Sequence, residues 1–288
     1  MTLPLLSLVI PTHNRPLILR RCLEHLERQT IRDQLEVIVV NDGTKVDSGQ
    51  WTVPVQILST PRCHQGTARN RGVEIAKGKY VLFIGDDIFL APDACEKHMG
   101  IAVSAETSTS PLTQTAVLGF TTWNPAVGIT PVMTWLEKSG WQFGYPMLKR
   151  YAHDFIPADI QHHFTYTSQI SLPTEIARKF PFREDVTLYG WEDIEWGWRL
   201  KKAGVKLFYE PDATALHHHH MTMEDSLKRM ETLGRSAVMM EKIASELKIV
   251  PRGFKKWKYR IAALLPGMRG RHAEAFIRGI TQVSPVVE

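Results

Sequence analysis

The sequence has little cysteine and no long apolar run. Its three cysteines, Cys22, Cys63 and Cys95, are far apart and form no CxxC pair. This spacing argues against a disulfide framework and a cysteine zinc site, and it indicates a reducing compartment. No stretch approaches the roughly 18 apolar residues of a membrane-spanning helix. The apolar start over residues 3–10 lacks a basic segment and a small-residue cleavage site, so it predicts a first strand and a cytoplasmic protein.

Basic charge is scarce outside the C-terminal part of the chain. The formal net charge is +5, but residues 248–278 hold nine basic side chains and one acid, Glu274. That segment therefore carries a charge of +8 and the remainder −3. Such a distribution does not indicate nucleic-acid binding by the main body.

The basic segment also mixes aromatic and aliphatic residues over 253–260 and 261–265. One interpretation is a segment that lies on an anionic membrane, which would make the protein peripheral on the inner face of that membrane. The other is a helix that packs on the main body and turns its basic side chains to solvent. The sequence leaves both open.

The first hundred residues alternate between strand and helix patterns. Because such alternation is typical of a parallel sheet covered by helices, we expect an α/β fold. Ligands of such sheets lie outside the carboxyl ends of the strands. The pattern predicts strands at 5–10, 35–40, 53–58 and 80–84, and helices through 19–26, over 66–76 and from Pro92 toward Met99.

The regular alternation of strand and helix patterns ends at about residue 105. Residues 123–166 are rich in aromatic side chains. Beyond residue 105 the pattern predicts a strand at 116–120, a helix from Trp191 to Lys202, a strand at 205–209, a turn at Pro211-Asp212 and a long helix over 223–247.

Two carboxylates follow the apolar run 80–84, in Gly85-Asp86-Asp87-Ile88. Neighbouring carboxylates at the mouth of a buried strand are costly unless a positive group meets them. A divalent cation that also takes oxygens from a diphosphate would do so. The alternative is a pair of solvated aspartates at the start of a loop.

Two further motifs suit a nucleotide. Asp42, in Asn41-Asp42-Gly43, can accept hydrogen bonds from a nucleobase or ribose, although an Asx turn is the more common role of such a residue. The run 66–72 opens a helix whose amides and Arg69 can meet phosphate. An amphipathic helix with exposed arginines is the alternative, and the run is no Walker motif because GxxxxGK[ST] is absent.

Acids and imidazoles gather later in the chain. Glu192, Asp193 and Glu195 begin a predicted helix, where they either complement the helix dipole or, beside tryptophan, supply a general base. The histidines 217–220 alternate between the two faces of an extended segment, 217 with 219 and 218 with 220. We expect one of them to bind a metal beside a carboxylate, and the alternative is a polar loop with one packed histidine.

Taken together, these motifs resemble the inverting GT-A glycosyltransferases of family 2. The resemblance covers about residues 5–220 and implies a Rossmann-like, mostly parallel central sheet flanked by helices, with a C-terminal helical extension. Five motifs carry it: Val-Ile-Pro-Thr-His-Asn-Arg at 9–15, Val-Val-Asn-Asp-Gly at 39–43, Gly-Thr-Ala-Arg-Asn-Arg-Gly at 66–72, Phe-Ile-Gly-Asp-Asp at 83–87, and the acidic motif at 191–195 with Arg199-Leu200.

The resemblance also divides the chain. Residues 1–105 would form the nucleotide-sugar-binding half and 106–222 the acceptor-binding half of one GT-A domain. A basic helical extension would follow at 223–288. The implied residues for nucleotide and donor binding are Pro11, Thr12, Asn14, Arg15, Asp42, Arg69 and Asp86.

The implied metal site departs from the family pattern. Asp87 would correspond to the last carboxylate of the DxD motif, but Gly85 stands where the first aspartate is usual. Asp86, in the middle, would contact the ribose or the sugar. His217 lies 24 residues after Asp193, where the family often places a metal-binding histidine, so it is preferred over 218–220. The cofactor would be Mn²⁺ or Mg²⁺.

The resemblance implies transfer of a sugar from a UDP- or TDP-sugar to a hydroxyl of a saccharide, lipid-linked or other acceptor. Asp193 would be the catalytic base, with Glu192 as the competing assignment, and Trp191 could stack on the acceptor. The setting would be the synthesis of cell-surface polysaccharide or glycoconjugate.

Three rivals predict other features. A sugar-nucleotide nucleotidyltransferase would carry a glycine-rich basic loop after the first strand, which Pro11-Thr12-His13-Asn14 is not. A non-catalytic nucleotide- or sugar-binding relative would tolerate Asp193→Asn. A membrane scaffold on the basic segment would leave the acidic motifs unexplained.

Overall fold

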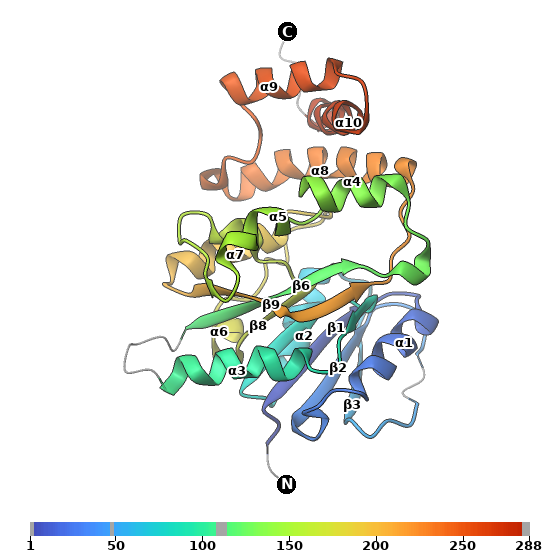
Figure 1. The fold of residues 1–288 in the computed structure, drawn as a ribbon, viewed down its shortest axis with the longest axis vertical. Coiled ribbons are helices and arrows are strands. Elements are labelled where there is room, and N and C mark those ends of the chain that lie inside the picture. The colour runs from blue at the N-terminus through green and yellow to red at the C-terminus, as the bar shows by residue number, and fades with distance from the viewer. Residues whose placement is uncertain (1–2, 47–48, 108–113, 284–288) are drawn as a thin grey trace.

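Figure 1 shows the structure, a computed structural model that describes residues 3–46, 49–107 and 114–283. A nine-stranded sheet with helices on both faces forms the larger part of the molecule. The strand order is β3-β2-β1-β4-β8-β6-β9-β5, and β7 pairs with β9. Among the described residues, no helix is long and apolar enough to cross a bilayer.

The first half of the sheet is parallel, as the alternating pattern predicts. Its strands β1 to β4 pair in the order 3-2-1-4. Side chains alternate along β1, so that Leu8 and Ile10 join one core and Val9 joins the other. The bounds are β1 Leu6–Thr12, β2 Leu35–Asn41, β3 Val55–Ser59 and β4 Tyr80–Ile84.

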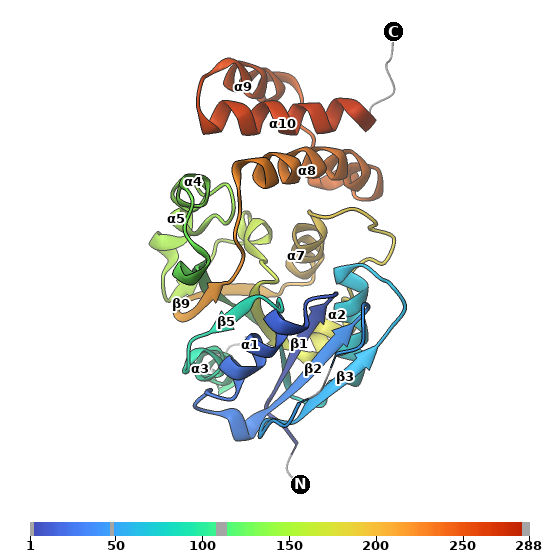
Figure 2. The same cartoon turned by 90° about the vertical axis from the view of Figure 1, so that its right-hand side faces the viewer.

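Helices cover both faces of this sheet, as Figure 2 shows from the side. Helix α1 packs through Leu19 and Leu23 into the core that holds Leu8, and α3 packs there through Met99. Helices α2, α6 and α7 contribute to the opposite core. Their bounds are α1 Pro16–Leu26, α2 Gln65–Ile75, α3 Ala94–Thr107, α6 Thr174–Lys179 and α7 Glu192–Lys202.

The second half of the sheet is mixed. Strand β8 runs antiparallel to both β4 and β6, whereas β6 and β9 are parallel. The turn predicted at Pro211-Asp212 is wrong, because both residues lie inside the continuous strand β9. The register there shifts from the pair Leu118–Tyr209 to the pair Phe120–Thr214, so β9 bulges instead of turning. The bounds are β5 Ile88–Leu90, β6 Thr115–Trp123, β7 Asp154–Phe155, β8 Gln169–Pro173 and β9 Lys206–His217.

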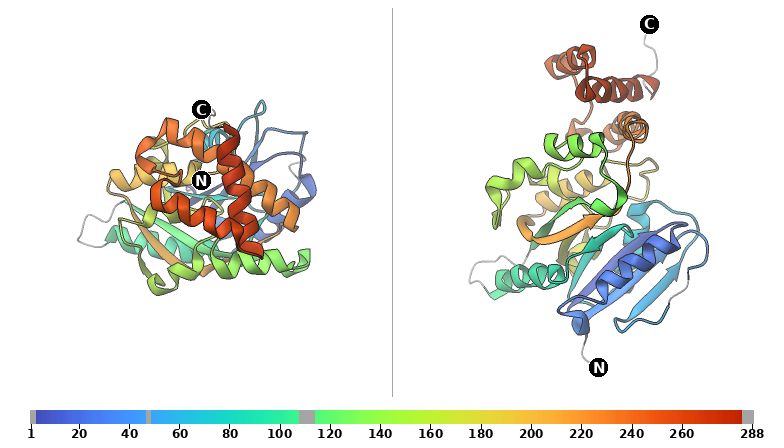
Figure 3. Two further views of the ribbon diagram at one scale, coloured as in Figure 1. Left: turned by 90° about the horizontal axis from the view of Figure 1, so that it is seen from above. Right: turned by 45° about the vertical axis from the view of Figure 1, so that its right-hand side comes forward.

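A stack of helices lies beyond one end of the sheet (Figures 1 and 3). Helices α8 and α10 cross closely, because Gly234 on α8 lies against the backbone of Phe276 and Gly279 on α10 lies against that of Glu231. The predicted helix 223–247 is α8 followed by a short 3₁₀ turn. The bounds are α4 Pro131–Ser139, α5 Tyr145–Leu148, α8 Met223–Ile243, α9 Gly253–Leu264 and α10 Met268–Val283.

Candidate active site

Three predicted site segments meet at the carboxyl ends of β1, β2 and β4. These strands are parallel neighbours, so the residues that end them lie at one edge of the sheet. The Thr12 hydroxyl, at the end of β1, donates a 2.7 Å hydrogen bond to Asp86 after β4. Pro11 lies beside Thr12 in β1, and Asp42 directly follows β2. The sequence motifs therefore form one site in space.

Arg15 pairs with both carboxylates of the predicted metal motif. Its Nη1 donates to Asp87 Oδ2 at 2.8 Å, and its Nε and Nη2 donate to Asp86. Asp86 is fully buried, and this burial raises its pKa to about 6 against the opposing charge of Arg15. Asp86 is buried and its carboxylate is already paired with Arg15. Its predicted contact with a ribose or sugar stays a prediction. The same holds for the contact of Arg15 with the donor.

Asp87 meets two histidines. Its Oδ2 lies 3.7 Å from His217 Nε2 and 3.8 Å from His219 Nδ1. Burial would raise the pKa of Asp87, but the two neighbouring imidazoles and the charge of Arg15 hold that pKa well below its usual range. Strand pairing sets this contact, because Ile88 in β5 is opposite His217 in β9.

These three side chains fit a divalent cation. Asp87, His217 and His219 each offer one ligand atom, and these atoms all lie within 4.8 Å of one another. The His217 ring stacks on that of Trp123 with the ring centroids 5.1 Å apart. Within the described part of the chain, its buried Nδ1 has no hydrogen-bond partner. A carboxylate with two imidazoles is a common donor set for first-row metals. The sequence prediction preferred His217 and missed His219, although the alternation of the histidines carried that signal.

The neighbouring His218 is turned away from this cluster. Its backbone amide donates to the Asp87 carbonyl at 2.7 Å, while its ring stacks on Phe89 and contacts Asn124. His218 therefore fixes the backbone beside Asp87 and does not offer its ring to the metal cluster. This is the alternation expected of an extended segment.

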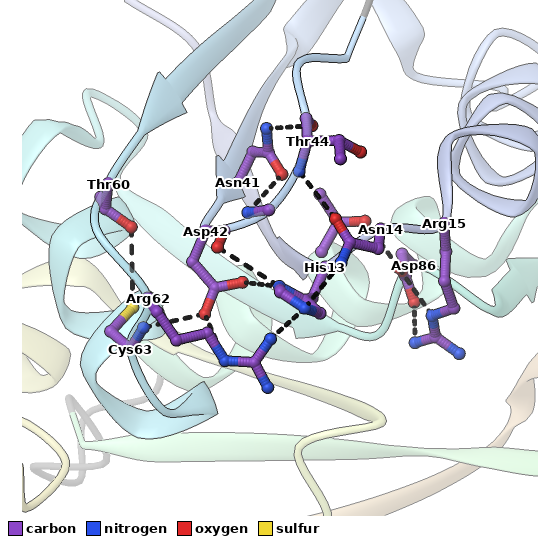
Figure 4. Close-up of polar contacts among 12 residues, drawn as sticks. His13, Asn14, Arg15, Asn41, Asp42, Thr44, Thr60, Arg62, Cys63 and Asp86 are labelled. Carbon is purple, nitrogen blue, oxygen red and sulfur yellow. Dashed lines mark hydrogen bonds and ion pairs between the residues drawn. The ribbon is translucent and has the colours of Figure 1, made fainter.

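Asp42 anchors a second part of the site, shown in Figure 4. Its Oδ1 lies 2.8 Å from His13 Nδ1, and its Oδ2 accepts a 2.9 Å hydrogen bond from the Cys63 amide. Arg62 contacts His13 and lies 4.0 Å from Asp42. The sequence prediction missed Arg62 and Cys63, because only the pairing of β2 with β3 brings their loop to Asp42.

A tight loop shapes the same region. Asn14 has a positive φ of 54°, and its Oδ1 accepts a 2.7 Å hydrogen bond from the Thr44 amide. Asn41 accepts from the Gly43 amide and donates to the Thr44 carbonyl. Asn14 thus holds two loops together. Its predicted contact with the donor stays a prediction.

Arg69 is the buried cation of the site. Its side chain is 4% exposed, and its Nε and Nη1 have no hydrogen-bond partner among the described residues. Its Nη2 donates a 3.2 Å hydrogen bond to Gln65 Oε1, and the guanidinium lies over the Phe182 ring. Burial lowers the pKa of Arg69, and the charges of Glu192 and Asp193 oppose this. A buried guanidinium with free donors is suited to an anionic ligand.

The first turn of α7 brings two acids toward Arg69. Burial and the charge of Glu192 raise the pKa of Asp193 to about 7, against the lowering effect of Arg69. Glu192 has a buried carboxylate oxygen, Oε2, that has no partner in the part of the chain that the structure describes. Glu195 instead pairs through both oxygens with Arg199 and is structural. Asp193 and Glu192 are thus the acids of this helix that remain for chemistry.

Trp191 precedes α7 in a left-handed conformation with φ of 72°. Its indole N–H donates to the Leu233 carbonyl on α8 at 2.9 Å, and its ring lies 6.4 Å from that of Phe276. These contacts tie the ring to the helical stack. Its stacking on an acceptor sugar stays a prediction.

Solved structures define the class to which this fold belongs. A mannosyltransferase from Pyrobaculum calidifontis, in complex with GDP-Man and Mn²⁺, matches 99% of this chain and 77% of its own with a TM-score of 0.57 at 17% identity. TarS 1-349 from S. aureus, in complex with UDP, matches 81% of this chain and 65% of its own with a TM-score of 0.52 at 14% identity. At such identities the likeness shows the fold alone, and the predicted GT-A fold is confirmed.

The family follows from the sequence match. The family model described as Glycosyl transferase family 2 matches residues 7–158, more than half of the chain. The chain therefore belongs to glycosyl transferase family 2.

Curated relatives share parts of the chain. "Putative glycosyltransferase EpsH" of Bacillus subtilis is 32% identical over 109 residues, which cover 35% of this chain and 31% of EpsH. Validoxylamine A glucosyltransferase of Streptomyces hygroscopicus is 26% identical over 245 residues, which cover 75% of this chain and 56% of that protein. The chain thus spans about a third of the length of relatives such as EpsH.

Proposed function

We propose that this protein is a metal-dependent, inverting glycosyltransferase that moves a sugar from a nucleoside diphosphate sugar to a hydroxyl acceptor. The observation that carries the proposal is the grouping of Asp87, His217 and His219 at the same edge of the sheet as Asp42. This combines a candidate metal cluster with polar groups for a nucleoside. Arg69, with its free N–H groups, supplies the anion-binding element.

The proposed donor is a UDP- or TDP-sugar. Asp42, held by His13 and the Cys63 amide, offers carboxylate oxygens to a nucleobase imide or to ribose hydroxyls. One solved structure with this fold is a complex with GDP-Man and another a complex with UDP, so the fold serves more than one base. The local contacts of Asp42 therefore decide the donor in this protein.

Asp87, His217 and His219 would hold the metal. When bound, the cation would neutralise charge that develops on the departing diphosphate. Two imidazoles favour Mn²⁺ over Mg²⁺, because Mg²⁺ prefers oxygen ligands in octahedral geometry.

The transfer is proposed as a direct displacement at the anomeric carbon. Asp193 removes the proton from the acceptor hydroxyl, and its raised pKa matches that task near neutral pH. Arg69 donates hydrogen bonds to the leaving diphosphate. A single displacement inverts the anomeric configuration. Glu192 is the competing base, because its buried Oε2 has no hydrogen-bond partner among the residues described.

The proposed acceptor site lies beside the metal cluster. A cavity there is lined by His217, Trp123, Phe143, Tyr145 and Glu137, among others. Aromatic walls with one carboxylate suit a saccharide, whose faces are apolar and whose edges carry hydroxyls. Chondroitin synthase of Pasteurella multocida is 35% identical over 101 residues, which supports a role in polysaccharide or glycoconjugate synthesis. The cytoplasmic location is likewise a proposal.

Calorimetric titration of UDP, TDP, GDP and CDP, each with and without Mn²⁺, tests the proposal. We expect Mn²⁺ to tighten the binding of one nucleotide by about tenfold or more, within the usual range of coupling between two ligands. Asp87→Ala and His219→Ala should lose this tightening. The matched control His218→Ala should keep it, because that ring faces the other side of β9's end. No binding of any nucleotide in the presence of Mn²⁺ would refute a nucleotide-sugar enzyme.

A further inference from the structure

Helix α9 carries an apolar stripe that the described part of the protein does not cover. Phe254 is 67% exposed, Trp257 55% and Leu264 84%, and Ile261 lies between them. Spacings of three, four and three residues place these four side chains on one face of the helix. The rings of Phe254 and Trp257 stack at 5.3 Å, so the stripe begins with a continuous aromatic surface.

The opposite face of α9 holds the helix on the protein. Tyr259 is half-buried and packs on Phe276 of α10 with ring centroids 5.5 Å apart. Ala262 and Ala263 are also partly buried. Helix α9 lies at the end of the stack farthest from the sheet (Figures 1 and 2), and its stripe is exposed there.

Basic side chains flank the stripe. Lys258 and Arg260 lie on either side of it at about 100° per residue, whereas Lys255 and Lys256 lie nearer the opposite face of α9. The sequence has no acid from 247 to 273. The Lys258 ammonium lies 4.7 Å over the Phe254 ring, at the border of the stripe. An apolar face with aromatic residues and a purely basic border is the pattern of a helix that lies in a membrane interface.

We propose that α9 binds the surface of an anionic membrane. Phe254, Trp257, Ile261 and Leu264 would be buried among the lipid headgroups, and Lys258 and Arg260 would contact acidic lipids. This goes beyond the proposed transfer reaction and does not depend on it. A second copy of the chain is a poorer occupant, because α9 packed on α9 would bring two purely basic borders together. An anionic surface meets both the charge and the apolar stripe.

Vesicle flotation of the full-length protein tests this. We expect binding to phosphatidylcholine vesicles with about 30% phosphatidylglycerol to exceed binding to pure phosphatidylcholine by about tenfold or more. Raising the salt to about 0.5 M should remove most of it by screening. The double variants Phe254→Ser/Trp257→Ser and Lys258→Glu/Arg260→Glu should each lose about tenfold in binding.

Matched controls distinguish binding through α9 from the effects of net charge and of exposed apolar side chains elsewhere. Leu17→Ser removes a residue that is 79% exposed on α1, and Lys45→Glu/Lys77→Glu makes the same charge change at exposed sites away from α9. Both controls should float like the wild type. Because the altered side chains are exposed, circular dichroism should give unchanged melting temperatures.

Four outcomes would overturn the proposal. Equal flotation with neutral and anionic vesicles would exclude acidic lipid as the partner. Unchanged flotation of Phe254→Ser/Trp257→Ser would exclude the apolar stripe as the contact. An equal loss of binding in Lys45→Glu/Lys77→Glu would assign the effect to net charge. A dimer in light scattering that this aromatic double variant makes monomeric would assign the stripe to a second copy.

Discussion

Asp193 combines two properties that a general base needs. Burial and the charge of Glu192 favour the neutral form of its carboxyl group and raise its pKa. The charge of Arg69 favours the ionised form and lowers the pKa, and the resulting pKa is about 7. Since only the ionised carboxylate accepts a proton, the rate should depend on the fraction that is ionised. Removing Arg69 would withdraw the one charge that lowers this pKa.

The first prediction concerns this ionisation. With saturating donor and metal, kcat/KM for the acceptor should rise about tenfold per pH unit below pH 7 and level off above it, because the base ionises there. Asp193→Asn should lower kcat by about 10² to 10⁴. Its affinity for the nucleotide in calorimetry should stay the same, since Asp193 contacts the acceptor in the proposed mechanism.

The matched variant Glu192→Gln distinguishes the two acids. It should retain most of kcat and move the rise of the pH profile to lower pH, because the charge of Glu192 raises the pKa of Asp193. The opposite pattern, with Glu192→Gln inactive and Asp193→Asn active, would make Glu192 the base.

At the scale of elements, α2 is placed by one glycine. A Cβ on Gly72 would lie 2.4 Å from Val9 Cγ1 and 3.3 Å from Val40 Cγ2, so α2 packs almost in backbone contact with β1 and β2. The same helix carries Arg69 in its first turns. The position of the buried cation therefore depends on the close approach that Gly72 permits.

The second prediction tests this contact. Gly72→Ala should lower the free energy of unfolding by about 1 to 3 kcal/mol, because the added methyl overpacks the interface. The control Gly100→Ala on α3 meets nothing within 4 Å and should stabilise by about 0.5 to 1 kcal/mol, since alanine favours helix. Urea denaturation measures both. Equal effects of the two substitutions would show that α2 does not rest on Val9.

The elements that the sequence predicted are those with a local signal. Strands β1, β2 and β4 are apolar runs with polar residues at their ends, and α2 ends before Lys77-Gly78. Strands β5 and β8 carry no such signal, because each is defined by an antiparallel partner far away in the chain. The proline at 211 suggested a turn, but the bulge of β9 opposite Gly119 accommodates it.

The candidate site likewise has residues with a local sequence signal and residues whose contacts depend on distant parts of the chain. Asp42, Asp86 and Asp87 were predicted because each follows a strand, and parallel strands end at one edge. The contacts of Arg15 with two carboxylates and of Cys63 with Asp42 depend on loops that only the folded chain brings together. The contact of Trp191 with α8 depends on the helical extension in the same way.

At the scale of the whole molecule, buried neutral imidazoles link stability to pH. His98 on α3 is fully buried, bonded through Nδ1 to Ser171 at 2.9 Å, and burial lowers its pKa to about 3. Burial also lowers the pKa of His162, to about 4, and that of His272. The three lie in different parts of the chain, so each adds independently to the proton uptake on unfolding.

The third prediction isolates one of them. The folded pKa of His98 lies below its unfolded value of about 6.5, so its contribution to stability is complete above pH 6.5 and is lost as the pH falls from there toward 3. Between pH 7 and 5, His98→Leu should therefore lose about 2 kcal/mol less unfolding free energy than the wild type. The raised pKa values of Asp86 and Asp193 act in the opposite sense but equally in both proteins, so the difference in urea denaturation between the two pH values cancels them. Equal losses in both proteins would mean that His98 takes up its proton in the folded state.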